Sequence, residues 1–179
     1  LALQTMRARR INPFEPIVLT IGSISAGTTT NVIPEVAVLR GTLRTTSEKT
    51  RERAHELIRQ TAEGIAAAHG ATAEVELPSG YPVTVNDAGV TEVVTSVATE
   101  LFGAERVVPM PTPTMGGEDF SYVLQRVPGV EAYLGATPAG LDPEQVPQTH
   151  SNKVVLDEAA MPTGVALHVA VAARLLAVG

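Results

Sequence analysis

Residues 35–45 read EVAVLRGTLRT, and this stretch decides the fold that we predict for the first half of the chain. Its β-branched residues and its alternating pattern indicate a strand. A period of two divides its side chains between two faces, one with Val36, Val38, Arg40, Thr42 and Arg44 and the other with Ala37, Leu39, Gly41 and Leu43. We expect the second face to meet the core, because it is the more apolar one.

The segments on either side of this strand predict a unit of helices and strands. Residues 17–25, IVLTIGSIS, favour another strand. Ser47 is a suitable N-cap for a helix with an apolar stripe, which Gly70 would end. Residues 72–77 alternate and predict a half-buried strand. Residues 1–10 read as a helix, so one further strand in front would complete the βαββαβ order of a ferredoxin-like unit.

The second half of the chain predicts alternating helices and strands. We expect helices at residues 87–103, at 118–127 and from Asp157 to the end, and short strands at 106–110 and 130–135. This alternation is typical of α/β layers. Two strands do not make a stable parallel sheet by themselves, so we expect this half to be part of something larger.

The composition argues against several classes of protein. Thirteen basic and nineteen acidic residues give a net charge of −6 and form no Lys/Arg block, so we expect no nucleic-acid partner. We find no continuous apolar run near the length that spans a bilayer, and expect no membrane helix. The absence of Cys excludes disulfides and thiolate metal sites within these residues. A cytoplasmic location is the default expectation.

The first ten residues predict that the natural protein continues upstream. No N-cap residue precedes Leu1, and three basic residues, Arg7, Arg9 and Arg10, stand where the C-terminus of a helix favours them. The segment therefore reads as the end of a helix rather than its beginning, and we expect residues to be missing before it.

Four histidines are candidate metal ligands. His55 and His69 fall in a predicted helix and are interpreted as solvated residues, and His168 is interpreted as a packed or surface-contact residue of the last helix. His150 differs because it falls in a loop, residues 148–152 (QTHSN), and loops on rigid scaffolds often carry function. Local sequence leaves both a ligand role and a purely structural role open for His150.

A glycine pair marks a second candidate site. Residues 114–120, TMGGEDF, join a predicted strand to a predicted helix. Gly116 and Gly117 would let a ligand approach the backbone closely, and the following helix start would suit an anion. The alternative is a tight turn in which Glu118 and Asp119 merely favour the helix start.

Asn31 and Arg44 flank the strand of residues 35–45 and form a third candidate. A guanidinium paired with an amide is suited to grip a carboxylate. Arg44 shares its predicted face with Arg40, which indicates a surface open to ligand or to solvent. The alternative is a strand face that is simply solvated.

Together these segments resemble one family, the metal-dependent amidohydrolase branch of the aminoacylase/carboxypeptidase superfamily, which includes hippurate hydrolase and the auxin–amino-acid conjugate hydrolases. The resemblance rests on residues 31–35 (NVIPE), 41–44 (GTLR), 115–120 (MGGEDF) and His150-Ser151 before a final helix. Tyr81-Pro82 adds to it at the predicted boundary. The match runs through almost the whole chain in the right order.

The resemblance implies an α/β (α+β) fold in two parts. Residues 1–79 would be a ferredoxin-like lid and dimerisation domain without its first strand, and residues 80–179 would be the C-terminal part of a metallopeptidase-like α/β catalytic domain. It also implies a homodimer formed through the lid, N-acyl amino acids or small peptides as substrates, and two divalent metal ions, zinc or manganese, in the full-length enzyme.

The resemblance assigns roles residue by residue. His150 matches the last metal ligand of the family. Asn31 and Arg44 match lid residues that contact the substrate carboxylate. Gly116 and Gly117 match a wall of the substrate cleft, which Glu118 would help to shape. These five residues form the predicted substrate-binding set. No catalytic residue of the family falls within this chain.

The chain also departs from the family pattern. It contains no His-x-Asp, no Cys-Gly-His-Asp and no Glu-Glu pair, so the other metal ligands and the carboxylate general base have no counterpart. Asn152 and Val154 stand where the family usually has proline and an aromatic residue. One imidazole cannot hold a metal pair, so we expect this polypeptide by itself to be inactive and to bind metal weakly or not at all.

Three functions remain in view. The motifs favour the C-terminal portion of an amidohydrolase that cleaves N-acyl amino acids. A peptidase or an N-carbamoyl-amino-acid hydrolase of the same superfamily is the second. The third is a non-catalytic ferredoxin-like dimerisation module whose exposed strand edge pairs with another copy.

Overall fold

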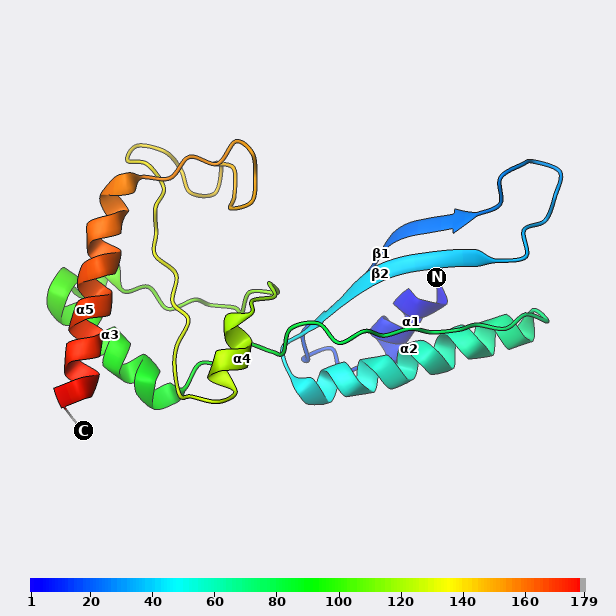
Figure 1. Ribbon diagram of the computed structural model, residues 1–179, viewed down its shortest axis with the longest axis horizontal. Coiled ribbons are helices and arrows are strands. Elements are labelled where there is room, and N and C mark those ends of the chain that lie inside the picture. Colours follow the sequence, from blue (N-terminus) through cyan, green and yellow to red (C-terminus); the bar gives the residue numbers. More distant parts are fainter. Residues whose placement is uncertain (178–179) are drawn as a thin grey trace. The chain divides into compact units, whose positions relative to one another are not determined.

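The structure is a computed structural model and describes residues 1–177 (Figure 1). Its helices and strands are α1 (Ala2–Arg10), β1 (Ile17–Ala26), β2 (Ala37–Thr45), α2 (Glu48–Ala68), α3 (Ala88–Phe102), η1 (Ala104–Arg106), α4 (Phe120–Leu124), η2 (Glu158–Ala160) and α5 (Met161–Ala177). The chain divides into two compact units, one formed by residues 1–84 with 111–122 and the other by residues 85–110 with 123 onward. The predicted division into a lid at 1–79 and a catalytic part at 80–179 concerns a longer protein and stays a prediction.

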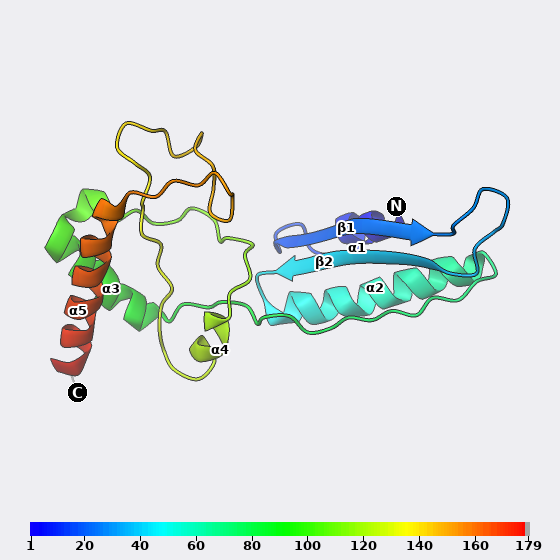
Figure 2. The ribbon, with the colours of Figure 1, turned by 45° about the horizontal axis from the view of Figure 1, so that its top comes forward.

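The first unit is built on an antiparallel hairpin of β1 and β2 (Figure 2). Both strands were predicted, and both are confirmed to within two residues. The register changes between Ile21 and Ser23, so Gly22 forms a β-bulge. Gly41 pairs with Ile21, and a Cβ on Gly41 would lie 2.3 Å from the carbonyl oxygen of Thr20. Glycine is therefore required at position 41 by the close approach of the two strands.

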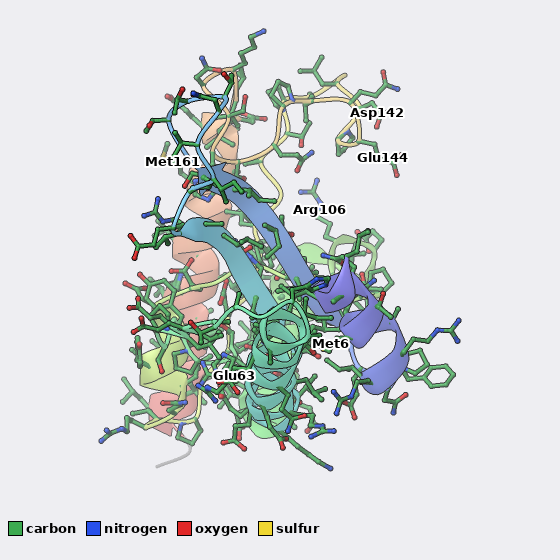
Figure 3. The ribbon with its side chains drawn as sticks, turned by 90° about the vertical axis from the view of Figure 1, so that its right-hand side faces the viewer. Met6, Glu63, Arg106, Asp142, Glu144 and Met161 are labelled. Atoms are coloured by element: carbon green, nitrogen blue, oxygen red, sulfur yellow. The ribbon has the colours of Figure 1, made fainter. Side chains whose placement is uncertain are left out.

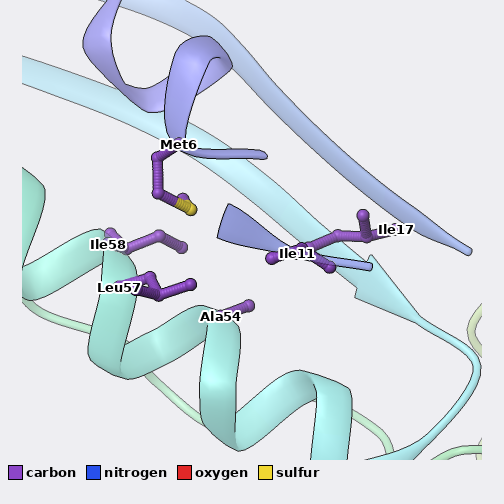
Figure 4. Packing of buried hydrophobic residues seen from close by; sticks show 6 residues of the cluster. All are labelled: Met6, Ile11, Ile17, Ala54, Leu57 and Ile58. Atoms are coloured by element: carbon purple, nitrogen blue, oxygen red, sulfur yellow. The ribbon is translucent and has the colours of Figure 1, made fainter. Parts of the chain in front are cut away.

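The helices α1 and α2 pack on the hairpin, as the view along α2 shows (Figure 3). Ser47 caps α2 as predicted, because its side chain accepts a hydrogen bond from the backbone N–H of Thr50 at 3.1 Å. The apolar stripe of α2 then faces α1 and the strands. The buried cluster that results comprises Met6, Ile11, Ile17, Ala54, Leu57 and Ile58, whose side chains point toward one another (Figure 4).

The predicted core face of β2 is only partly correct. Leu43 packs against the buried cluster, whereas Leu39 keeps 53% of its surface exposed. Leu39 lies instead beside a shallow apolar groove of about 340 Å³, which is also lined by Leu1 and Ile24.

Residues 72–77 do not form the predicted strand. The alternation itself is present, since Val75 and Leu77 are half-buried against the core and Glu74 and Glu76 are exposed. A strand also needs a hydrogen-bonded neighbour, and the described residues provide none beside this segment. The mixed α/β class is confirmed, whereas the ferredoxin-like arrangement stays a prediction.

The second unit contains α3, η1, η2 and α5. Asp87 caps α3 as predicted, by accepting a hydrogen bond from the N–H of Val90 at 2.9 Å, and the helix ends at Gly103 with φ +92°. Asp157 caps η2, which leads into α5. The last predicted helix is thus confirmed to Ala177, and positions 178 and 179 lie outside the described residues.

Three other predicted elements are corrected. The helix expected at 118–127 is present only as α4. The strands expected at 106–110 and 130–135 are absent, since Arg106 ends η1 and residues 107–110 and 130–135 have no strand pairing. Their pattern is that of buried strands, but neither has a ladder partner in the described part of the chain. In place of a strand, the side-chain amide of Asn86 accepts from the N–H of Glu131 at 2.9 Å and donates to its carbonyl oxygen at 3.0 Å.

The prediction that no apolar run approaches the length of a membrane span is wrong for the last helix. The helical segment Glu158–Ala177 has a mean hydropathy of 1.5 and is long enough to cross a bilayer. Core helices of soluble proteins can have the same length and composition. In this unit the helix packs against α3, and Arg174 forms an ion pair with Glu100 at 2.6 Å.

Candidate functional site

The first unit brings two of the predicted substrate-binding segments together. Arg44, next to the last residue of β2, is exposed, and its Nη1 donates a hydrogen bond to the carbonyl oxygen of Met115 at 2.6 Å. Met115 directly precedes Gly116 and Gly117, and it lies 71 residues from Arg44 in the sequence. A guanidinium has five N–H donors, so this contact leaves donors available for a ligand.

The glycine loop leaves its backbone open. Neither Gly116 nor Gly117 has a positive φ, so neither is there to permit a left-handed turn. A Cβ on Gly116 would meet no atom within 4 Å. On Gly117 it would lie 3.6 Å from Cδ2 of Tyr81. The pair therefore presents backbone beside Arg44 without covering it with side chains, which suits the close approach of a ligand.

Glu118 has a local partner. One of its carboxylate oxygens accepts from the N–H of Asp119 at 3.1 Å, and its carbonyl oxygen accepts from the hydroxyl of the buried Ser121 at 2.5 Å. These contacts support the start of α4, which is the alternative that the sequence left open for this residue. Its place in a wall of a substrate cleft stays a prediction.

Asn31 does not join this site within the described chain. It lies in the loop between β1 and β2, where its Oδ1 accepts from the hydroxyl of Thr29 at 3.0 Å. Arg44 lies near the other end of β2, and the seven residue steps from Ala37 to Arg44 span roughly 23 Å of strand. The structure therefore does not pair this amide with this guanidinium, and the role of Asn31 stays a prediction.

His150 has an unusual backbone. It is exposed and has a φ of +75°. No other non-glycine residue of the described chain has a positive φ. A hydrogen bond of 3.0 Å from the N–H of Ser151 to the carbonyl oxygen of Gln148 closes the turn around it. A left-handed conformation at a non-glycine residue costs on the order of 1–3 kcal/mol and is often retained at functional sites. This strain supports a functional role for His150.

The described residues do not by themselves fit a metal pair. Among residues 1–177, no group of three or more His, Asp or Glu side chains could hold a metal ion. His168 is exposed on α5, His69 is exposed at the C-cap of α2, and His55 is half-buried on α2. Burial, with the positive charges of Arg51 and Arg59, lowers the pKa of His55. Of the four histidines, only His150 keeps a predicted role as a metal ligand. No reaction step through a metal follows from this chain alone.

The sequence interpretation missed two parts of the first site. The carbonyl oxygen of Met115 was not expected to bind Arg44, because a backbone acceptor leaves no mark in the sequence. The packing of Tyr81 and Tyr122 was also missed, although Tyr81 stood within the family resemblance without a role. A signal was available, because the chain has only three Tyr residues and two of them meet here.

Comparison with known proteins agrees with the resemblance. The family model described as Peptidase family M20/M25/M40 matches residues 6–174. The chain is 33% identical over 174 residues to thermostable carboxypeptidase 2 of Saccharolobus solfataricus, covering 97% of this chain and 43% of that protein. It is 38% identical over 134 residues to N-acetyl-L-cysteine deacetylase of Bacillus subtilis, covering 75% of this chain and 32% of that protein.

A solved structure has a similar fold. It is a Bacillus subtilis protein described as a dinuclear metal-binding peptidase of the M20 family, with a TM-score of 0.74 and 28% identity. The similarity covers 89% of this chain and 42% of that protein. The chain spans 40–43% of the length of the first curated relatives that it matches.

Proposed function

Because this chain belongs to Peptidase family M20/M25/M40, we propose that it is the C-terminal portion of an amidohydrolase that cleaves the amide bond of N-acyl amino acids. Relatives named as a deacetylase of an N-acetyl amino acid and as a carboxypeptidase support hydrolysis of an amide bond beside a carboxylate. The observation that carries the proposal is the contact of 2.6 Å between Arg44 and Met115.

This contact places a fixed positive charge beside open backbone. The amino-acid product of the reaction carries a free carboxylate, and a guanidinium can bind a carboxylate through two parallel hydrogen bonds. The exposed Gly116–Gly117 backbone would accommodate the ligand without a side-chain clash. Holding the carboxylate would orient the scissile amide, which lowers the entropic part of the barrier.

The full-length protein would hold two divalent metal ions, zinc or manganese, and His150 would supply one ligand. Metal ions in such a site supply an activated water at neutral pH. The other ligands and the general base would come from residues outside this chain. The polypeptide of 179 residues by itself is therefore proposed to be inactive.

The proposal extends to assembly and location. The first unit is proposed to mediate a homodimer, and the sheet of two strands in the described chain has an outer edge on each strand that could pair. Sedimentation of the full-length protein would measure its mass in solution. A cytoplasmic location and the absence of nucleic-acid and membrane partners are also proposed, and fractionation of the source cells would test the location.

The peptidase alternative has specific support, because the relative named as a carboxypeptidase matches over 97% of this chain. The test uses full-length protein reconstituted with zinc or manganese, assayed on an N-benzoyl amino acid, an N-carbamoyl amino acid and a dipeptide. Fastest hydrolysis of the N-benzoyl substrate, lost on chelation, is expected. Preference for the dipeptide or the N-carbamoyl substrate would favour the alternative, and a stable dimer without any hydrolysis would favour the non-catalytic module.

A further inference from the structure

The aromatic ring of Tyr81 lies against the Gly116–Gly117 loop. It meets the ring of Tyr122 edge-on, with centroids 6.0 Å apart and planes at 81°. A Cβ added to Gly117 would lie 3.6 Å from Cδ2 of the same Tyr81 ring, so the ring lies beside this glycine. The loop thus has the Arg44 contact at Met115 and an aromatic surface beside Gly117.

The backbone around Tyr81 is held by the first turn of α2. Glu48 accepts a hydrogen bond from the N–H of Val83 at 3.1 Å and forms an ion pair with Arg51 at 2.5 Å. Nη1 of Arg51 in turn lies 3.5 Å from the carbonyl oxygen of Tyr81. Because α2 is a helix of 21 residues that packs on the buried core, these contacts tie Tyr81 to a rigid element.

We infer that Tyr81 is a positioning residue, which holds the Gly116–Gly117 loop beside Arg44 so that both bind the same substrate carboxylate. Glycine has no side chain to pack and has the most backbone freedom to lose, so a loop with two glycines needs support from outside. The ring of Tyr81 provides this support. The inference rests on the proposed function and names a residue that the function itself does not assign.

The test compares Tyr81→Ala with Tyr81→Phe in the full-length, metal-loaded protein. Tyr81→Phe is the matched control, because it keeps the ring. On an N-acyl amino acid, we expect Tyr81→Ala to raise KM about 10-fold, with kcat changed about 2-fold or less. On the carboxamide of the same substrate, which has no free carboxylate, KM should stay nearly unchanged. An equal rise on both substrates, or a Phe variant that behaves like the Ala variant, overturns the inference.

A second measurement does not depend on the reaction. Limited proteolysis with proteinase K should cleave within residues 111–119 faster in Tyr81→Ala and at the wild-type rate in Tyr81→Phe. An unchanged cleavage rate in the folded Ala variant overturns the inference. Faster cleavage in a protein that hydrolyses no N-acyl amino acid would support the positioning role of Tyr81 on the loop while the proposed function fails. If circular dichroism shows that Tyr81→Ala is unfolded, Tyr81→Leu, which removes the ring but keeps an apolar side chain, takes its place with the same expected results.

Discussion

The guanidinium of Arg44 donates a hydrogen bond of 2.6 Å to the carbonyl oxygen of Met115, and so joins the end of β2 to the glycine loop. The two residues are 71 positions apart in the sequence, and both belong to the first compact unit. The predicted substrate-binding residues Arg44, Gly116 and Gly117 are therefore neighbours in space. This relationship is the basis of the first prediction.

Substitution Arg44→Ala in the full-length enzyme should chiefly raise KM for substrates with a free carboxylate. A charge-assisted hydrogen bond contributes about 1.5–3 kcal/mol, which corresponds to a rise of about 10- to 150-fold. Arg40→Ala is the matched control, because Arg40 is exposed on the same face of the same strand. Steady-state kinetics on an N-acyl amino acid and its methyl ester measure the effect. An equal effect on the ester would contradict the carboxylate-binding role.

Substitution His150→Ala in the full-length enzyme should abolish turnover and lower the metal content, because one ligand is removed. Metal analysis of the purified protein measures the stoichiometry directly. His69→Ala is a suitable control, since His69 is exposed at the end of α2 and should leave the metal content unchanged. Wild-type stoichiometry in the His150→Ala protein would refute the ligand assignment.

Substitution Gly41→Ala should destabilise the hairpin. The added Cβ would lie 2.3 Å from the carbonyl oxygen of Thr20, and overpacking of this kind costs about 1–3 kcal/mol. Gly22→Ala is the control in the same hairpin, because a Cβ there meets no atom within 4 Å, and we expect a change within about 0.5 kcal/mol. Urea unfolding of both variants provides the comparison, and equal stability of the two would contradict the close approach of the strands.

The stability of the first unit should fall in acid through His55. Burial first, and then the charges of Arg51 and Arg59, lower its pKa from 6.5, while Glu48 opposes this. The unfolded chain therefore binds a proton at His55 before the folded chain does. The contribution of neutral His55 to stability is present above pH 6.5 and is lost as the pH falls through its lower folded pKa.

Urea midpoints measured between about pH 8 and about pH 5 would test this dependence on His55. His55→Gln serves as the reference, because it removes the titrating group and keeps a polar side chain. The wild-type midpoint should fall relative to that of His55→Gln as the pH decreases. Parallel curves for the two proteins would show that His55 does not contribute.

Substitution Leu57→Ala should lower the free energy of unfolding more than Ile65→Ala on the same helix. Leu57 is fully buried between α1, α2 and the hairpin, and a Leu→Ala change in a core costs about 2–5 kcal/mol. Ile65 lies two turns further along α2 and keeps 49% of its surface exposed, so Ile65→Ala should cost clearly less. The free energy of unfolding of each variant measures the difference, and similar losses would contradict the position of the core.

Local sequence determined the elements whose signals lie within a few residues. The caps at Ser47 and Asp87 are side-chain hydrogen bonds to backbone N–H groups three positions on, so their helices could be predicted closely. The hairpin strands could be predicted from β-branched residues and alternation. The family resemblance likewise came from short motifs in order, and the match over residues 6–174 confirms it.

Only the tertiary structure decided which of these local patterns found partners. Residues 72–77 keep the alternation of a strand yet have no hydrogen-bonded neighbour in the described chain, and Leu39 has the pattern of a core residue yet stays exposed. The contact between Arg44 and Met115 depends equally on folding. Helix caps and hydrophobic periodicity are properties of neighbouring residues. Strand pairing, burial and a shared binding surface depend on how segments that are distant in sequence lie in space.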